Sequence, residues 1–136
     1  MKRLLSFCLV ISFISSLFVY DVCLNGIYYN LGSEASVTSG GAGVLYSGVV
    51  VIPDSISYGG TNYAVEAISD SAFFGCTSLT KVICGSNVFE VGTSAFENCS
   101  ALDTIVFTGQ LQNIMKHAFK NSGLSHIYSY SSVVPT

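Results

Sequence analysis

The chain has 136 residues, half of them apolar and only a tenth charged, which suits one domain of ordinary size. Its formal net charge is −3 at pH 7, and Arg3 is its last arginine. Nucleic acids and anionic lipid headgroups are bound by clustered Lys and Arg, so this composition excludes both as expected partners.

The N-terminus has the pattern of a secretory signal peptide. Lys2 and Arg3 precede an apolar run from Leu4 to Tyr20 that only serines interrupt. We expect cleavage between about Ser16 and Tyr20, and therefore a secreted or cell-surface protein. A retained membrane anchor and a buried helix are the alternatives, although the run is slightly short for a membrane span. Cleavage would leave three lysines against eight acidic residues, a net charge of −5.

The following residues, 21–48, carry no repeat and are expected to form an N-terminal cap. Within them Gly40-Gly41-Ala42-Gly43 lacks the Lys-Ser/Thr pair of a phosphate-binding loop, so we interpret it as a flexible turn. A strand of a first coil is expected over Val49–Pro53. The longer connection that follows contains Gly59-Gly60, which favours the tight turn of an inserted β-hairpin.

An internal repeat of 23 residues occupies the rest of the chain. An Ala-Phe pair recurs at Ala72-Phe73, Ala95-Phe96 and Ala118-Phe119, and in each copy a Leu follows and opens a short β-type run. A period in the low twenties with a Leu-x-x-apolar-x-apolar run is typical of a solenoid, in which stacked neighbours bury what one copy cannot. The domain prediction is a signal peptide over 1–20, a cap over 21–48, and three to four coils over 49–136.

The repeat predicts which side chains are buried and which are exposed. Alternate strand residues face opposite ways, and the phenylalanines should fill the space between coils, contributing about 2–3 kcal/mol each. The inward side chains of two strands are expected to include Val82, Cys84 and Phe107. The predicted core is Ile68, Phe73, Cys76, Leu79, Val91, Phe96, Cys99, Leu102, Ile105, Ile114, Phe119 and Leu124. The outward strand positions are the candidate binding face: Lys81, Ile83, Thr104, Val106, His126 and Tyr128.

The copy Val91-Gly-Thr-Ser-Ala-Phe-Glu-Asn-Cys-Ser-Ala-Leu102 resembles the BspA-type leucine-rich repeat, as found in gut Bacteroidetes. Ser69 stands where that family usually has Gly, and the copy beginning at Ile114 departs further. The resemblance extends over about 21–134. It implies an α/β-type, right-handed solenoid of short parallel strands and short helical or 3-10 turns, with a β-hairpin N-terminal cap. It also implies export, adhesion to host matrix proteins such as fibronectin and fibrinogen or to other cells, and no catalytic residue.

The segment after the last expected strand, Ser129–Thr136, does not resemble a cap, although solenoids need capping units. We expect either a truncated or degenerate member, or a last coil covered by a partner or by the chain itself. This leaves a structural function as an alternative to adhesion, in which the open C-terminal coil pairs with another chain and the protein self-associates.

No residue pattern indicates catalysis, a metal or a cofactor. Cys76 and Cys99 share a repeat position and should stack as small buried side chains, with a disulfide as the alternative. The chain has no Cys-x-x-Cys motif, no paired histidines and no Gly-x-Ser-x-Gly elbow, and the repeat places His117 and His126 on different faces. A glycan-handling accessory protein is a weaker alternative, because the chain has no Trp and its acids are scattered.

Overall fold

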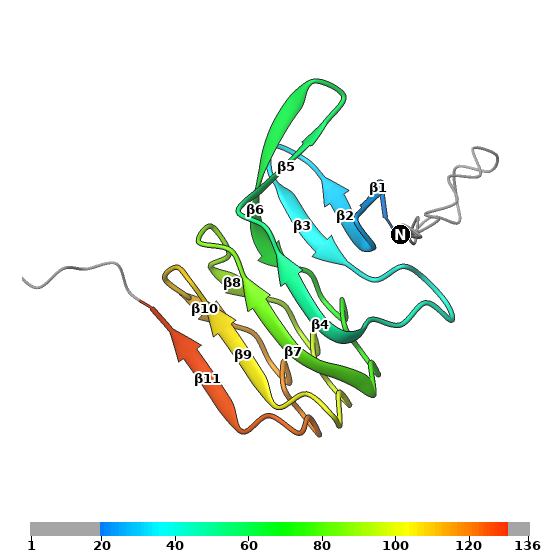
Figure 1. The fold of residues 1–136 in the computed structure, drawn as a ribbon, viewed down its shortest axis with the longest axis vertical. Coiled ribbons are helices and arrows are strands. Elements are labelled where there is room, and N and C mark those ends of the chain that lie inside the picture. The colour runs from blue at the N-terminus through cyan, green and yellow to red at the C-terminus, as the bar shows by residue number, and fades with distance from the viewer. Residues whose placement is uncertain (1–19, 131–136) are drawn as a thin grey trace, which may run out of the picture.

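The structure, a computed structural model, describes residues 20–130. They form a stack of coils whose strands line up into a sheet on each of two sides (Figure 1). The predicted signal peptide, apart from Tyr20, and residues 131–136 lie outside the described residues. Within the described part, no helix is long and apolar enough to cross a membrane.

One side of the stack is a four-stranded parallel sheet, here called the repeat sheet. Its spatial order is β11-β9-β7-β4, so that each coil adds one strand beside the strand of the previous coil. The repeat sets this register, because Lys81 lies opposite Thr104, 23 residues later, and Thr104 lies opposite His126, 22 residues later, in the copy that is one residue shorter. The strands are β4 (Ser47–Ile52), β7 (Ser78–Cys84), β9 (Thr104–Phe107) and β11 (His126–Ser129).

The other side is a mixed sheet with the order β1-β2-β3-β6-β8-β10. Its N-terminal strands are antiparallel, whereas β3, β6, β8 and β10 run parallel to one another. The N-terminal strands therefore continue the stack through the pairing of β3 with β6. The strands are β1 (Val22–Leu24), β2 (Ile27–Leu31), β3 (Ala35–Thr38), β6 (Thr61–Ile68), β8 (Glu90–Val91) and β10 (Asn113–Ile114).

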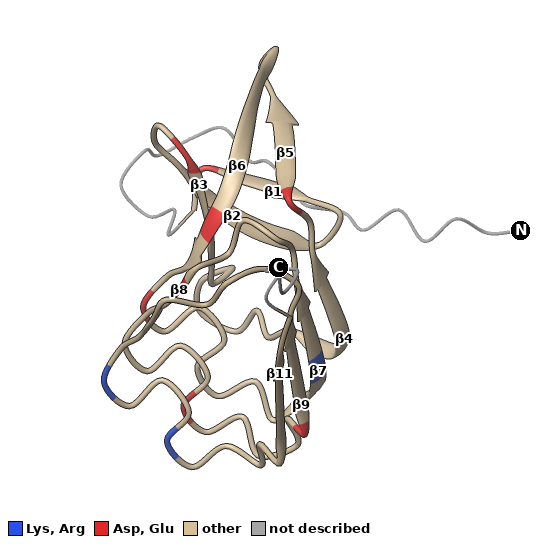
Figure 2. Cartoon of the chain, turned by 90° about the vertical axis from the view of Figure 1, so that its left-hand side faces the viewer, with Lys and Arg blue, Asp and Glu red and all other residues tan. Residues whose placement is uncertain are grey.

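The predicted hairpin is present between β5 (Ser55–Tyr58) and β6, and it projects beyond the coils (Figure 2). Gly59 and Gly60 join the two strands with φ of 58° and 81°. A two-residue turn of this kind needs positive φ at both central positions, which glycine adopts without strain. The Gly-Gly pair was therefore a sufficient sequence signal for this element.

The predicted helical or 3-10 turns do not form helices within residues 20–130; the Ala-Phe segments are consecutive tight turns. In the first of them, the N–H groups of Phe73 and Gly75 donate to the next coil, to the carbonyls of Ala95 and Glu97. One residue just before each Ala-Phe pair has a left-handed backbone conformation. In the three copies these residues are Ser71, Ser94 and His117, with φ of 54–61°. A second left-handed position, at Gly75, Asn98 and Asn121, has φ of 54–69°. An α-helix needs negative φ and internal bonds from every N–H, so these turns cannot be one.

The core runs through the middle of the stack. Nine of the predicted core side chains are at most 2% exposed: Ile68, Phe73, Cys76, Leu79, Val91, Phe96, Cys99, Leu102 and Ile105. The prediction is wrong for Ile114, which is 49% exposed, and incomplete for Phe119 and Leu124, which are only partly buried. The reason is their position on the last described coil, where no further described coil packs over them.

A row of aromatic rings passes through all the coils. The rings of Phe73 and Phe96 stack with centroids 4.8 Å apart, and those of Phe96 and Phe119 are 5.4 Å apart. Towards the N-terminus the Tyr46 ring covers Phe73 at 4.6 Å. The Tyr46 hydroxyl donates to the Thr38 carbonyl at 2.6 Å, and burial raises the Tyr46 pKa. The row continues beyond Tyr46, to Tyr28 at 6.1 Å and from Tyr28 to Tyr20 at 4.5 Å, so aromatic contacts extend into the N-terminal strands, which the sequence analysis did not foresee.

Candidate functional site

The candidate site is the outer surface of the repeat sheet, here called the strand face. The strand register arranges its side chains in two rows that cross all four strands. The first row is Val49, Lys81, Thr104 and His126. The second row is apolar throughout and consists of Val51, Ile83, Val106 and Tyr128.

The strand face exists because β-strand side chains alternate between the two sides of a sheet. On β7 and β9, Val82, Cys84, Ile105 and Phe107 are fully buried, while the residues between them remain partly exposed. Exposure is greatest on the outer strands, where Val49 is 59%, Val51 57% and Tyr128 46% exposed. The structure therefore brings all six predicted face residues together.

Sequence reasoning missed Val49 and Val51 as members of this face. Val49–Pro53 was identified as a strand, but its outward positions were not assigned. The signal was available, because Val49 and Val51 have the same alternation as Lys81 and Ile83 on β7. They extend the apolar row by one strand and make β4 an apolar edge of the sheet.

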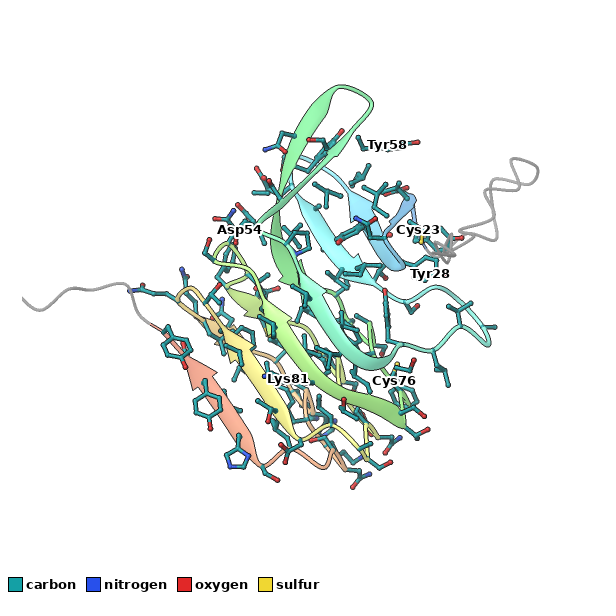
Figure 3. All side chains as sticks on the ribbon, viewed as in Figure 1. Cys23, Tyr28, Asp54, Tyr58, Cys76 and Lys81 are labelled. Carbon is teal, nitrogen blue, oxygen red and sulfur yellow. The ribbon has the colours of Figure 1, made fainter. Side chains whose placement is uncertain are left out.

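Charge on the strand face is sparse and lies in the first row (Figure 2). Lys81, on β7 in Figure 3, forms no ion pair within the described residues. His126 Nδ1 lies 3.7 Å from an Asp103 carboxylate oxygen, to which the Thr104 hydroxyl also donates at 2.7 Å. The hydrogen bonds from Thr104 and Ser125, and then the nearby His126, lower the Asp103 pKa. Asp103 is therefore ionised at neutral pH and places a negative charge beside the His126 ring.

The predicted thiol pair lies inside the solenoid and away from the strand face. Cys76 and Cys99 are buried free thiols, and the Cys99 thiol donates to the Phe73 carbonyl at 2.9 Å. The hydrogen bond between the two thiols lowers the pKa of Cys76, and together with burial it raises the pKa of Cys99. Their contacts are those of packed core residues.

The remaining candidate groups do not converge. His117 occupies an exposed turn with φ of 61°, whereas His126 belongs to the repeat sheet. Within residues 20–130, no group of three or more His, Cys, Asp or Glu side chains could hold a metal ion. The strand face can therefore support contact with a macromolecular surface through its apolar, aromatic and few charged side chains.

Comparison with known proteins gives one family match. The family model described as "BspA type Leucine rich repeat region (6 copies)" matches residues 54–134. No curated protein matches the chain.

Three solved structures share the fold. A leucine-rich repeat protein from Bacteroides ovatus superposes with a TM-score of 0.61 at 24% identity, over 81% of this chain and 37% of its own. A leucine rich cell surface protein from Faecalibacterium prausnitzii gives 0.57 at 19%, over 81% and 31%. A leucine-rich repeat protein from Bacteroides capillosus gives 0.58 at 19%, over 80% and 97%. The chain thus spans about a third of the length of the first two.

Proposed function

Because the chain belongs to the BspA-type leucine-rich-repeat family, we propose that it is an exported, non-catalytic protein whose strand face binds another protein in adhesion. The family and the leucine-rich-repeat neighbours support a protein-binding role in general. One neighbour is described as a cell surface protein, which supports a surface location. The N-terminal basic and apolar pattern supports export, to the cell surface or the medium.

The observation that carries this proposal is the apolar row of the strand face. Val51, Ile83, Val106 and Tyr128 lie side by side on four parallel strands, where adjacent strands are about 4.8 Å apart. A continuous exposed apolar strip beside polar side chains is typical of protein interfaces, and an exposed tyrosine is a common anchor. Fibronectin and fibrinogen are the partners that the family resemblance suggests first.

The test measures binding of the mature chain to immobilised fibronectin and fibrinogen. The double variant Lys81→Ala, Tyr128→Ala removes a charge and an aromatic ring from the strand face. Loss of one such anchor should weaken binding at least about tenfold. The matched control is Lys116→Ala, Tyr58→Ala, which removes the same two side-chain types from an exposed turn and the hairpin. Equal weakening in both variants, or no saturable binding by a folded monomer, would refute matrix adhesion through this face.

A second candidate function is assembly through the last described coil. Ile114 is 49%, Met115 39% and Ile127 47% exposed on it, and Phe119 is partly exposed. The Phe119 N–H makes no backbone hydrogen bond within the described residues, although the equivalent Phe73 and Phe96 N–H groups donate to the following coil. Association that increases with concentration in sedimentation experiments, and that Ile127→Glu abolishes, would favour this function. A monodisperse monomer at all concentrations would exclude it.

A further inference from the structure

A hollow of about 910 Å³ lies beside β4, at the junction between the repeat sheet and the N-terminal strands. Three segments line it, namely the β1–β2 hairpin, the end of the loop before β4 together with β4 itself, and the start of β5. In Figure 1, β4 is the last strand of its sheet and leads directly into β5. The hollow adjoins the proposed strand face, because Val49 and Val51 belong to both, but the rest of its lining lies outside that face.

The hollow follows the edges of two strands. Three consecutive residues of β4, 49–51, and three of β5, 55–57, contribute to its lining. Consecutive strand residues point to opposite sides, so a hollow lined by all of them must run along the edge of the strand. Within the described residues β4 pairs only with β7, and β5 only with β6. Each strand therefore presents one edge of backbone N–H and C=O groups without a strand partner.

The lining of the hollow contains no charged residue. It consists of Leu24, Asn25, Gly26, Ile27, Tyr28, Tyr29, Val44, Leu45, Tyr46, Ser47, Val49, Val50, Val51, Pro53, Ser55, Ile56 and Ser57. Among these, Leu45 is 59% and Val44 40% exposed. A charged ligand would lose its hydration here without finding an ionised partner, which is costly. The chemistry therefore selects an uncharged occupant with apolar side chains.

The open edge indicates the shape of that occupant. Natural proteins usually protect a free edge with lysines, a proline or a bulge, because an unpaired edge pairs readily with another chain. Here the only bulge is at Gly48–Val49 and the proline follows the strand, at Pro53, so Val50–Ile52 have no such protection. An extended peptide satisfies exposed N–H and C=O groups in a way that a compact small molecule cannot.

We propose that this groove binds an uncharged, extended peptide segment of a partner protein, which adds a strand to the free edge of β4. The peptide backbone pairs with β4, and alternate apolar side chains contact Val44 and Leu45, in the part of the lining just before β4. This mode is β-strand addition, in which main-chain bonds supply affinity and side-chain contacts supply selectivity. The groove shares Val49 and Val51 with the strand face, but the proposal does not depend on the proposed strand-face function.

The test uses the full chain and three blocked peptides. The first alternates threonine and valine, the second is the same peptide with N-methylated alternate amides, and the third has glutamate in place of valine. The first peptide should bind and slow hydrogen exchange of β4 amides more than those of β11, the other edge of the repeat sheet. The N-methylated peptide lacks the pairing donors and the glutamate peptide carries charge, so both should bind at least about tenfold more weakly.

Two protein variants complete the test. Leu45→Lys places a charge in the groove and should weaken binding of the threonine-valine peptide roughly tenfold. Tyr58→Lys places the same charge on the hairpin outside the groove lining and should leave binding unchanged. Equal binding of the N-methylated peptide, equal protection of β11, or equal loss in both variants would overturn the proposal. None of these results bears on the Lys81→Ala, Tyr128→Ala comparison, so the two proposals can fail separately.

Discussion

The aromatic row makes a quantitative prediction at Phe96. This side chain is fully buried and its ring stacks on both Phe73 and Phe119. Phe96→Ala removes the burial, both stacking contacts and the separation between two coils, so we expect a loss of about 3–5 kcal/mol in the free energy of unfolding. Phe119→Ala removes a partly exposed ring that stacks on Phe96 alone among the described rings, and a loss of about 1–2 kcal/mol is expected.

The assay is urea unfolding of both variants, followed by far-ultraviolet circular dichroism, with the m-value fitted separately. A domain of this size has roughly 5–15 kcal/mol of stability, so both variants should retain a measurable folded baseline. The smaller loss expected for Phe119→Ala, by about 1 kcal/mol or more, is the decisive quantity. Equal losses, or a larger loss for Phe119→Ala, would refute the idea that the stacked rings hold successive coils together.

Three further predictions concern stability. Gly109→Ala would place a Cβ against the Ser86 backbone carbonyl and should cost about 2 kcal/mol or more. Gly32→Ala would bring its Cβ only to an ordinary contact with the Glu34 carbonyl oxygen at 3.8 Å, without a positive φ, and should stay within about 0.5 kcal/mol in the same urea assay. Asp54→Ala removes the carboxylate that accepts hydrogen bonds from the Ser86 N–H at 2.6 Å and from the Ser86 hydroxyl at 3.0 Å. Thermal unfolding should show a loss of about 1–2 kcal/mol in the free energy of unfolding, whereas no loss would mean that water replaces both bonds. Burial raises the pKa of Cys84 and of Tyr29 to about 12, so both groups stabilise the folded state in their protonated form. Their contribution to stability should be constant below pH 8 and be lost as the pH rises from about 9 towards 12. Tyr29→Phe should flatten the part of that decline above pH 10, and an unchanged decline would contradict the assignment.

Much of the fold could be predicted because the repeat makes each coil a copy of the previous one. The alignment of the repeat copies placed Lys81, Thr104 and His126 in one row, and the strand register confirms this. The Gly59-Gly60 turn was predictable because few residues tolerate positive φ at two successive positions.

The turns and the ends of the stack were not predictable in the same way. Ser94 and His117 do not mark a left-handed backbone as glycine would, so the absence of helix at the Ala-Phe segments had no clear local signal. Ile114 matches Ile68 and Val91 in sequence, but its exposure depends on whether another coil covers it. The groove beside β4 depends on how the N-terminal strands pack, which no periodicity encodes.

The central claim is that the strand face is the contact surface for a protein partner. The most direct measurement is a methyl nuclear magnetic resonance titration of the mature chain with fibronectin and with fibrinogen. We predict that the methyl signals of Ile83 and Val106, which lie on the strand face and outside the groove, shift or broaden first, while those of the buried Val88 and Val91 do not. Changes confined to Val44 and Leu45 would place the contact in the groove instead, and no saturable change with either protein would contradict the claim for matrix partners.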